Sequence, residues 1–135
     1  MAKFTVLMSA CLSNLTASQN MARTGQLATS LTEGDLGFVR CIGVYKGVSE
    51  FSMAIPCNDH YNISQLKELA REFEQESILV VDNESKEAHL IELDDCIDVK
   101  VAIGKWTKTT WNDCKYNHDN YTYFPEANVY YVCRP

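Results

Sequence analysis

Basic residues and long hydrophobic runs are scarce in this sequence. Its 12 Lys and Arg stand against 18 Asp and Glu, which gives a formal charge of −6. Duplex nucleic acid is bound through clustered cations that neutralise phosphates, so we expect no nucleic-acid partner. No apolar run approaches the roughly 20 residues of a membrane span. The apolar segment that follows the first three residues is too short for a secretion signal. We therefore expect a cytoplasmic protein with no membrane partner.

Sequence patterns for nucleotide cofactors and metals are also missing. Residues 9–20, which follow the first expected strand, contain no glycine, whereas a dinucleotide-binding loop needs G-x-G-x-x-G. The histidines His60, His89 and His118 are scattered, and no His or Cys pair has a usual zinc spacing. No G-x-S-x-G motif marks a nucleophilic serine. We therefore expect neither a metal site nor a cofactor.

The cysteines are even in number but lack any disulfide or metal signature. None of them forms a C-x-x-C motif, and their spacings are wide and irregular. In a cytoplasmic protein such residues act as small hydrophobic side chains. We predict free thiols at Cys11, Cys41, Cys57, Cys96, Cys114 and Cys133.

The first part of the chain alternates strand and helix patterns. Residues 4–8 are apolar on both faces, which is typical of a central strand, and a helix is predicted from Met21 to Leu31 with Asn20 as N-cap and Gly34 at its end. The remaining predictions for this part are a hairpin over 38–55, a helix over 63–73 capped by Asn62 or Ser64, and a buried strand over 78–81.

This order, strand, helix, strand, strand, helix, strand, is that of a ferredoxin-like α/β sandwich. We expect one domain over residues 1–135, with a ferredoxin-like core at 4–82 and a sheet extension and Tyr-rich tail at 83–135. In the extension, strands are expected at 88–93 and 97–103, followed by loops and one short strand near 129–133.

One face of such a sheet is bare, because both helices lie on the other face. The residues expected to line it are Val39, Cys41, Ser52 and Ala54. Three subunits around an axis would bury this face, so we expect a homotrimer with clefts between subunits.

The segment MSACLSNLTASQNMART, residues 8–24, resembles the amino-terminal segment of the phage-encoded S-adenosylmethionine lyases, formerly called SAM hydrolases. Further likeness lies in the hairpin, at Gly43-Val44-Tyr45, Glu50-Phe51 and Cys57. It continues through Glu72-Phe73-Glu74-Gln75 into Ile78-Leu79-Val80 and ends near residue 95.

The resemblance implies a GlnB-like (PII-like) trimer with substrate sites at subunit interfaces. It also implies a reaction without water, metal or cofactor, in which the carboxylate of S-adenosylmethionine attacks its own Cγ. The products are methylthioadenosine and homoserine lactone. In the host cytoplasm such a lyase depletes the methyl donor and thereby counters restriction.

The resemblance also supplies candidate site residues. Glu50 matches a family acidic position and is expected to hold the substrate ammonium, while Tyr45 is expected to position the carboxylate. Each also has an ordinary interpretation, as a solvated hairpin charge and as cross-strand packing. The candidate substrate-binding residues, whose polarity a cap or a surface helix would equally explain, are Ser9, Ser13, Asn14, Asn20, Glu72 and Gln75.

Two other classes of function stay open at this point. A PII-like fold also suits a non-catalytic sensor that binds an adenosine nucleotide and signals through the Tyr-rich tail. A protein of charge −6 can also act as an acidic decoy that occupies the DNA groove of a restriction enzyme, although this imbalance of charge is mild for a DNA mimic.

Overall fold

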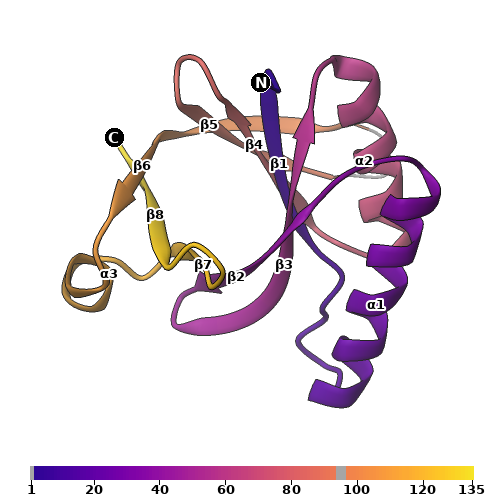
Figure 1. The fold of residues 1–135 in the computed structure, drawn as a ribbon, viewed down its shortest axis with the longest axis horizontal. Helices are drawn as coiled ribbons and strands as arrows, with labels where there is room; N and C mark the ends of the chain where they lie inside the picture. Colours follow the sequence, from indigo (N-terminus) through magenta and orange to yellow (C-terminus); the bar gives the residue numbers. More distant parts are fainter. Residues whose placement is uncertain (1, 94–96) are drawn as a thin grey trace.

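The computed structural model describes residues 2–93 and 97–135 and shows a closed, antiparallel eight-stranded barrel with three helices outside it (Figure 1). In chain order the elements are β1 (Phe4–Ser9), α1 (Ala17–Glu33), β2 (Val39–Tyr45), β3 (Val48–Cys57), α2 (His60–Glu72), β4 (Ser77–Asp82), β5 (Glu87–Glu92), β6 (Val99–Thr109), α3 (Trp111–Asn117), β7 (Tyr121–Phe124) and β8 (Val129–Arg134).

The strand order around the barrel is β1-β3-β2-β7-β8-β6-β5-β4, and β4 closes the ring by pairing with β1. β1 therefore lies between β3 and β4, which explains why it is apolar on both faces. Its Val6 and Met8 pack toward the helices, whereas Leu7 between them faces the barrel interior.

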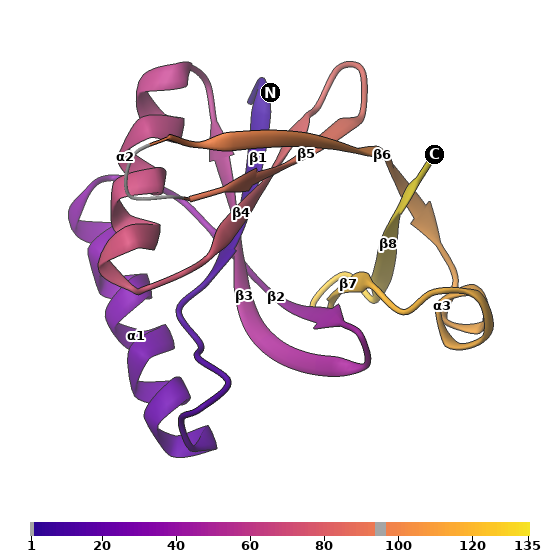
Figure 2. The same cartoon turned by 180° about the vertical axis from the view of Figure 1, so that it is seen from behind.

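Helices α1 and α2 cover one side of the barrel, and α3 lies on the opposite side beside β6 and β8 (Figure 2). The covered side forms the larger core, in which Leu27 and Leu31 of α1 and Leu66 of α2 are fully buried against β1 and β3. No helix in the described parts of the chain combines the length and the hydrophobicity that a membrane span requires.

Both long helices begin one turn earlier than predicted. Thr16, not Asn20, is the N-cap of α1, because Thr16 and Gln19 form a reciprocal capping box. Asp59, not Asn62 or Ser64, caps α2 by accepting from the amide of Asn62 at 3.0 Å. The predicted end of α1 at Gly34 is confirmed, since the Gly34 amide bonds to the carbonyl of Ser30.

The predicted ferredoxin-like, PII-like sandwich is wrong as the fold of this chain. The sheet does not remain open, because β5, β6, β8 and β7 continue it from β4 and join it to β2. Cys41, Ser52 and Ala54, which were expected to lie on a bare face, are buried within the barrel. Only Val39 stays exposed, so strands of the same chain fulfil the role expected of neighbouring subunits. The structure therefore removes the reason for expecting a trimer.

The tail is more regular than predicted. It contributes α3, β7 and β8, and β6 continues to Thr109, beyond the predicted end at residue 103. Gly104 makes this long strand possible, because its φ of +114° accompanies a register shift against β5. A Cβ there would overlap the carbonyl oxygen of Arg134, so glycine lets β6 pass from β5 to β8 and close the barrel.

The predicted free thiols are confirmed for Cys11, Cys41, Cys57, Cys114 and Cys133, while Cys96 lies outside the described residues. Burial raises the pKa of Cys41 to about 12 and that of Cys57 to about 11. Both are therefore protonated at neutral pH and pack as small hydrophobic side chains.

Candidate functional site

Several of the predicted site residues meet at the end of the barrel where β1 finishes. We call Ser9, Gly43, Tyr45, Glu50 and Ser52 the Glu50 rim. Strand register brings them together, because Ser9 lies opposite Ser52, Gly43 opposite Glu50, and Tyr45 opposite Val48. The loop after β1 and the β2–β3 hairpin both reach this lower end of the barrel in Figure 1.

Glu50, a predicted catalytic residue, presents its carboxylate at this rim. Alternation along β3 places it on the same face as Ser52 and Ala54, which is the face toward the barrel interior. Among the described residues it has no hydrogen bond or ion-pair partner. Its outer part is exposed to solvent, while partial burial against the barrel wall raises its pKa above the ordinary 4.5.

Ser9 lies on the rim, but its hydroxyl is already engaged. The side chain is buried, and its Oγ donates to the carbonyl of Phe51 at 2.8 Å. The same oxygen accepts from the amide of Cys11 at 2.9 Å. Ser9 therefore fastens the end of β1 to β3 and starts the following loop.

Asn20 also holds this loop, residues 10–16. Its Oδ1 accepts from the amide of Leu12 at 2.9 Å, and its Nδ2 donates to the carbonyl of Leu12 at 3.0 Å. Both ends of the side-chain amide are thus used on a single backbone residue. The polarity of Asn20 serves the shape of the loop in this structure.

Gln75 and Arg23 fasten the same loop from the other side. Gln75 Nε2 donates to the carbonyl of Cys11 at 3.0 Å, and Arg23 Nε donates to that of Ala10 at 2.6 Å. Arg23 also donates through Nη2 to the carbonyl of Phe73 at 2.5 Å. The loop is therefore held rigidly beside the Glu50 rim by side chains that lie far apart in the sequence.

The other predicted site residues take no part in the hydrogen bonds that hold the loop at residues 10–16. Tyr45 is on the same face as Glu50 but 63% exposed, and Lys46 Nζ lies 5.3 Å from the centre of its ring. Ser13, Asn14 and Glu72 are exposed. The side chains of these three residues form no hydrogen bond with any described residue. They remain predictions as substrate contacts.

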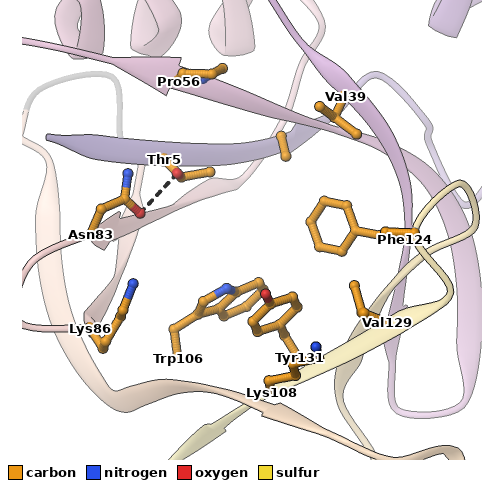
Figure 3. Close-up of a pocket in the computed structure, with 12 residues that line it drawn as sticks. Thr5, Val39, Pro56, Asn83, Lys86, Trp106, Lys108, Phe124, Val129 and Tyr131 are labelled. Carbon is orange, nitrogen blue, oxygen red and sulfur yellow. Dashed lines mark hydrogen bonds between the residues drawn. The ribbon is translucent and has the colours of Figure 1, made fainter. Parts of the chain in front are cut away.

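A second candidate site, which the sequence interpretation missed, is a cavity of about 550 Å³ at the other mouth of the barrel. Figure 3 shows Trp106, Tyr131 and Phe124 along one wall of it, with Thr5 and Asn83 across from them. The aromatic residues of the tail were noted in the sequence, but only the closure of the barrel assembles them into a wall.

The described residues contain no group of three or more His, Cys, Asp or Glu that would suit a metal ion. Independence from metals and cofactors stays a prediction, to be tested with a chelator. The carboxylate at the Glu50 rim instead offers a place for an organic cation.

Comparison with known proteins gives one clear result. The model of the S-adenosylmethionine lyase family matches residues 6–134, which is nearly the whole chain and includes the tail beyond residue 95. Among curated protein sequences, none matches significantly.

Proposed function

Since the chain belongs to the S-adenosylmethionine lyase family, we propose that it splits S-adenosylmethionine into methylthioadenosine and homoserine lactone at the Glu50 rim. The observation that carries the proposal is this family match, which spans residues 6–134 and so nearly the entire barrel. The Glu50 carboxylate, which has no partner among the described residues, supports the placement of the site at the rim.

The reaction needs no water and little acid or base help. The substrate carboxylate forms a bond to its own Cγ while the Cγ–S bond breaks, and the sulfur keeps the electron pair. Sulfonium and carboxylate charges disappear together, which leaves neutral methylthioadenosine and a lactone that still carries the ammonium. The protein's main task is therefore to hold the methionine part folded with carboxylate and Cγ in contact.

Glu50 is suited to this task because it provides an anion beside open space. Gly43, its cross-strand neighbour, has no side chain, so the substrate ammonium can approach the carboxylate from that side. Partial burial lowers the local dielectric and strengthens the attraction to a cation. The ammonium stays on the lactone, so the neutral methylthioadenosine is left without a charge attraction to Glu50, which favours its release.

The surrounding protein contributes in two further ways. The loop at residues 10–16, fixed by Asn20, Arg23 and Gln75, supplies a rigid backbone next to the rim. We place the adenosine part against this loop, where Ser13 and Asn14 are exposed and accessible. The formal charge of −6 attracts a substrate of net positive charge from solution.

Cleavage in water enriched in oxygen-18 tests the proposed reaction. Intramolecular attack predicts that the first product is an unlabelled lactone, and that homoserine formed from it later carries the label only in its carboxylate. Label in the homoserine hydroxyl would mean that water attacked Cγ, and the protein would be a hydrolase. Binding of the substrate with no methylthioadenosine formed would favour the sensor alternative.

In a bacterial host, we propose that this activity counters restriction by lowering the concentration of S-adenosylmethionine. Expression of the protein is expected to reduce cellular S-adenosylmethionine and to protect incoming unmodified phage. The Glu50→Gln protein, whose activity is expected to be much lower, is expected to lose the protection. Protection that persists in this variant would favour the decoy alternative.

A further inference from the structure

The cavity at the mouth opposite the Glu50 rim has a chemistry of its own. We call Lys86, Trp106, Lys108, Phe124 and Tyr131 the lysine mouth, since all five line this cavity of about 550 Å³. The volume lies within the roughly 300–1,000 Å³ that is typical of sites for small organic ligands. The remaining wall is mostly apolar.

The aromatic wall is already assembled. Trp106 and Tyr131 stack with their ring centres 5.0 Å apart and their planes 5° from parallel. Phe124 meets Tyr131 edge-on, with ring centres 5.7 Å apart. These rings come from β6, β8 and β7, so the barrel strands fix their positions. Such a wall favours a ligand with a flat ring.

The charge of the cavity is opposite to that of the whole chain. Lys86 and Lys108 line it, and no carboxylate of the described residues does, although Asp and Glu outnumber Lys and Arg overall. Within the described residues neither lysine has an acidic partner. Two such cations in the lining of one cavity favour an anion and disfavour a substrate of net positive charge.

The backbone holds Lys86 at this opening in an unusual conformation. Its φ is +67°, its amide donates to the carbonyl of Asp82 at 2.8 Å, and its carbonyl accepts from the amide of Trp106 at 2.7 Å. Left-handed backbone is uncommon for residues other than glycine and persists where the surroundings enforce it. Lys86 and Trp106 are thereby fixed to each other.

Neutral hydrogen-bonding groups face the aromatic wall. Thr5 Oγ1 donates to Asn83 Oδ1 at 3.0 Å, as the dashed line in Figure 3 shows. Asn83 Nδ2 in turn donates to the carbonyl of Ala2 at 3.0 Å. This fixed pair leaves hydroxyl and carbonyl lone pairs as acceptors toward the cavity.

We propose that the lysine mouth is a second ligand site, which binds a flat aromatic anion of the nucleoside monophosphate class. The base lies against Trp106 and Tyr131, and the phosphate is reached by Lys86 and Lys108. This site goes beyond the lyase activity and is separate from the Glu50 rim.

Calorimetric titration of the full chain with adenosine monophosphate tests the proposal, with adenosine and inorganic phosphate as partial ligands. Adenosine monophosphate is expected to bind at least tenfold more tightly than either, because only it uses both the rings and the lysines. The fluorescence of Trp106, read in a Trp111→Phe variant, is expected to change on binding. Raising the salt concentration should weaken binding. Equal affinity for adenosine would overturn the role of the lysines.

Matched variants locate the site. The double variant Lys86→Ala with Lys108→Ala is expected to bind adenosine monophosphate at least tenfold more weakly. Lys100 is another exposed lysine of β6, and Lys100→Ala is expected to leave the affinity unchanged. Thermal unfolding verifies that each variant is folded. Unchanged affinity in the double variant contradicts the proposal.

The same titration separates this site from the lyase site, because it measures binding without turnover. Glu50→Gln is expected to leave the affinity for adenosine monophosphate unchanged, and excess S-adenosylmethionine should not displace the ligand. Displacement by S-adenosylmethionine would show one shared site and would overturn the proposal, whatever the outcome for cleavage.

Discussion

Glu50 of β3 lies directly opposite Gly43 of β2, so the carboxylate at the barrel rim has a cross-strand neighbour without a side chain. A Cβ on Gly43 would come 3.2 Å from Ser52 Oγ, which is a tight but relievable contact. Gly43 also faces Thr122 of β7, which is buried. Glycine therefore keeps space beside the carboxylate that larger residues would fill.

Gly43→Ala is expected to reduce cleavage of S-adenosylmethionine by about tenfold while changing stability little, because the methyl group occupies substrate space. The control is Gly25→Ala in α1, where a Cβ would meet nothing within 4 Å. The control should keep full activity and gain about 0.5–1 kcal/mol of stability from the better helix former. Steady-state kinetics and urea unfolding measure both effects. Equal activity of the two variants would show that the space beside Gly43 is not used.

Arg23→Ala is expected to lower the free energy of unfolding by about 2–3 kcal/mol. The guanidinium, largely buried, donates to the carbonyls of Ala10 and Phe73, and its removal leaves both without that donor. Arg23→Lys should recover part of the loss, since an ammonium keeps the charge but not the two-pronged geometry. Urea unfolding gives the energies, and faster proteolysis within residues 10–16 would report the freed loop. A loss below about 0.5 kcal/mol would contradict this role.

The pH dependence of kcat/KM should report the protonation of the Glu50 carboxylate. Burial raises its pKa above 4.5, so activity is expected to fall with a midpoint above 4.5 as the pH is lowered. A raised carboxyl pKa also means that this group favours folding below its unfolded pKa, and that this contribution is lost as the pH rises through the folded value. Glu50→Gln should therefore slightly stabilise the protein at neutral pH. Lower stability of the variant at neutral pH would contradict the sign.

Asp113 of α3 accepts hydrogen bonds from Thr109 and Asn117 and pairs with Arg134 of β8, and these contacts should weaken in acid. Hydrogen bonds from Thr109 and Asn117, aided by the charge of Arg134, lower the pKa of Asp113 from 3.8 to about 2. A lowered carboxyl pKa contributes stability above the unfolded value, and this contribution is lost as the pH falls from about 3.8 to about 2. The fluorescence of Trp111, which begins α3, should report the change. Asp113→Asn should remove most of this pH dependence, and an unchanged transition in that variant would place its origin elsewhere.

Local signals in the sequence were sufficient for many of the elements. The hairpin and the end of α1 at Gly34 were predicted because their determinants lie within a few residues of one another. Barrel closure depends on pairs that lie far apart in the chain, such as Phe4 with Asp82 and Ile42 with Tyr123. No local periodicity distinguishes such pairs from an open sheet that meets another subunit.

The candidate site shows the same division. Glu50 was predicted from the family resemblance, and within the described residues its carboxylate has no partner, so its catalytic role stays a prediction. Asn20 and Gln75 were expected to bind substrate, but here both bond to the backbone of the loop after β1. A polar side chain has the same sequence signature in either role. The lysine mouth was missed because its rings come from three strands that no short motif connects.

Formation of methylthioadenosine by Glu50→Gln, compared with Glu87→Gln, tests the central claim most directly. Glu87 is an exposed glutamate of β5 next to the inward-facing Ala88, so it lies on the outer face of the barrel and provides a matched loss of charge. The expected result is a fall of about a hundredfold, or about 3 kcal/mol, for Glu50→Gln and an unchanged rate for Glu87→Gln, with both proteins folded. Equal rates for the two variants would contradict a catalytic site at Glu50.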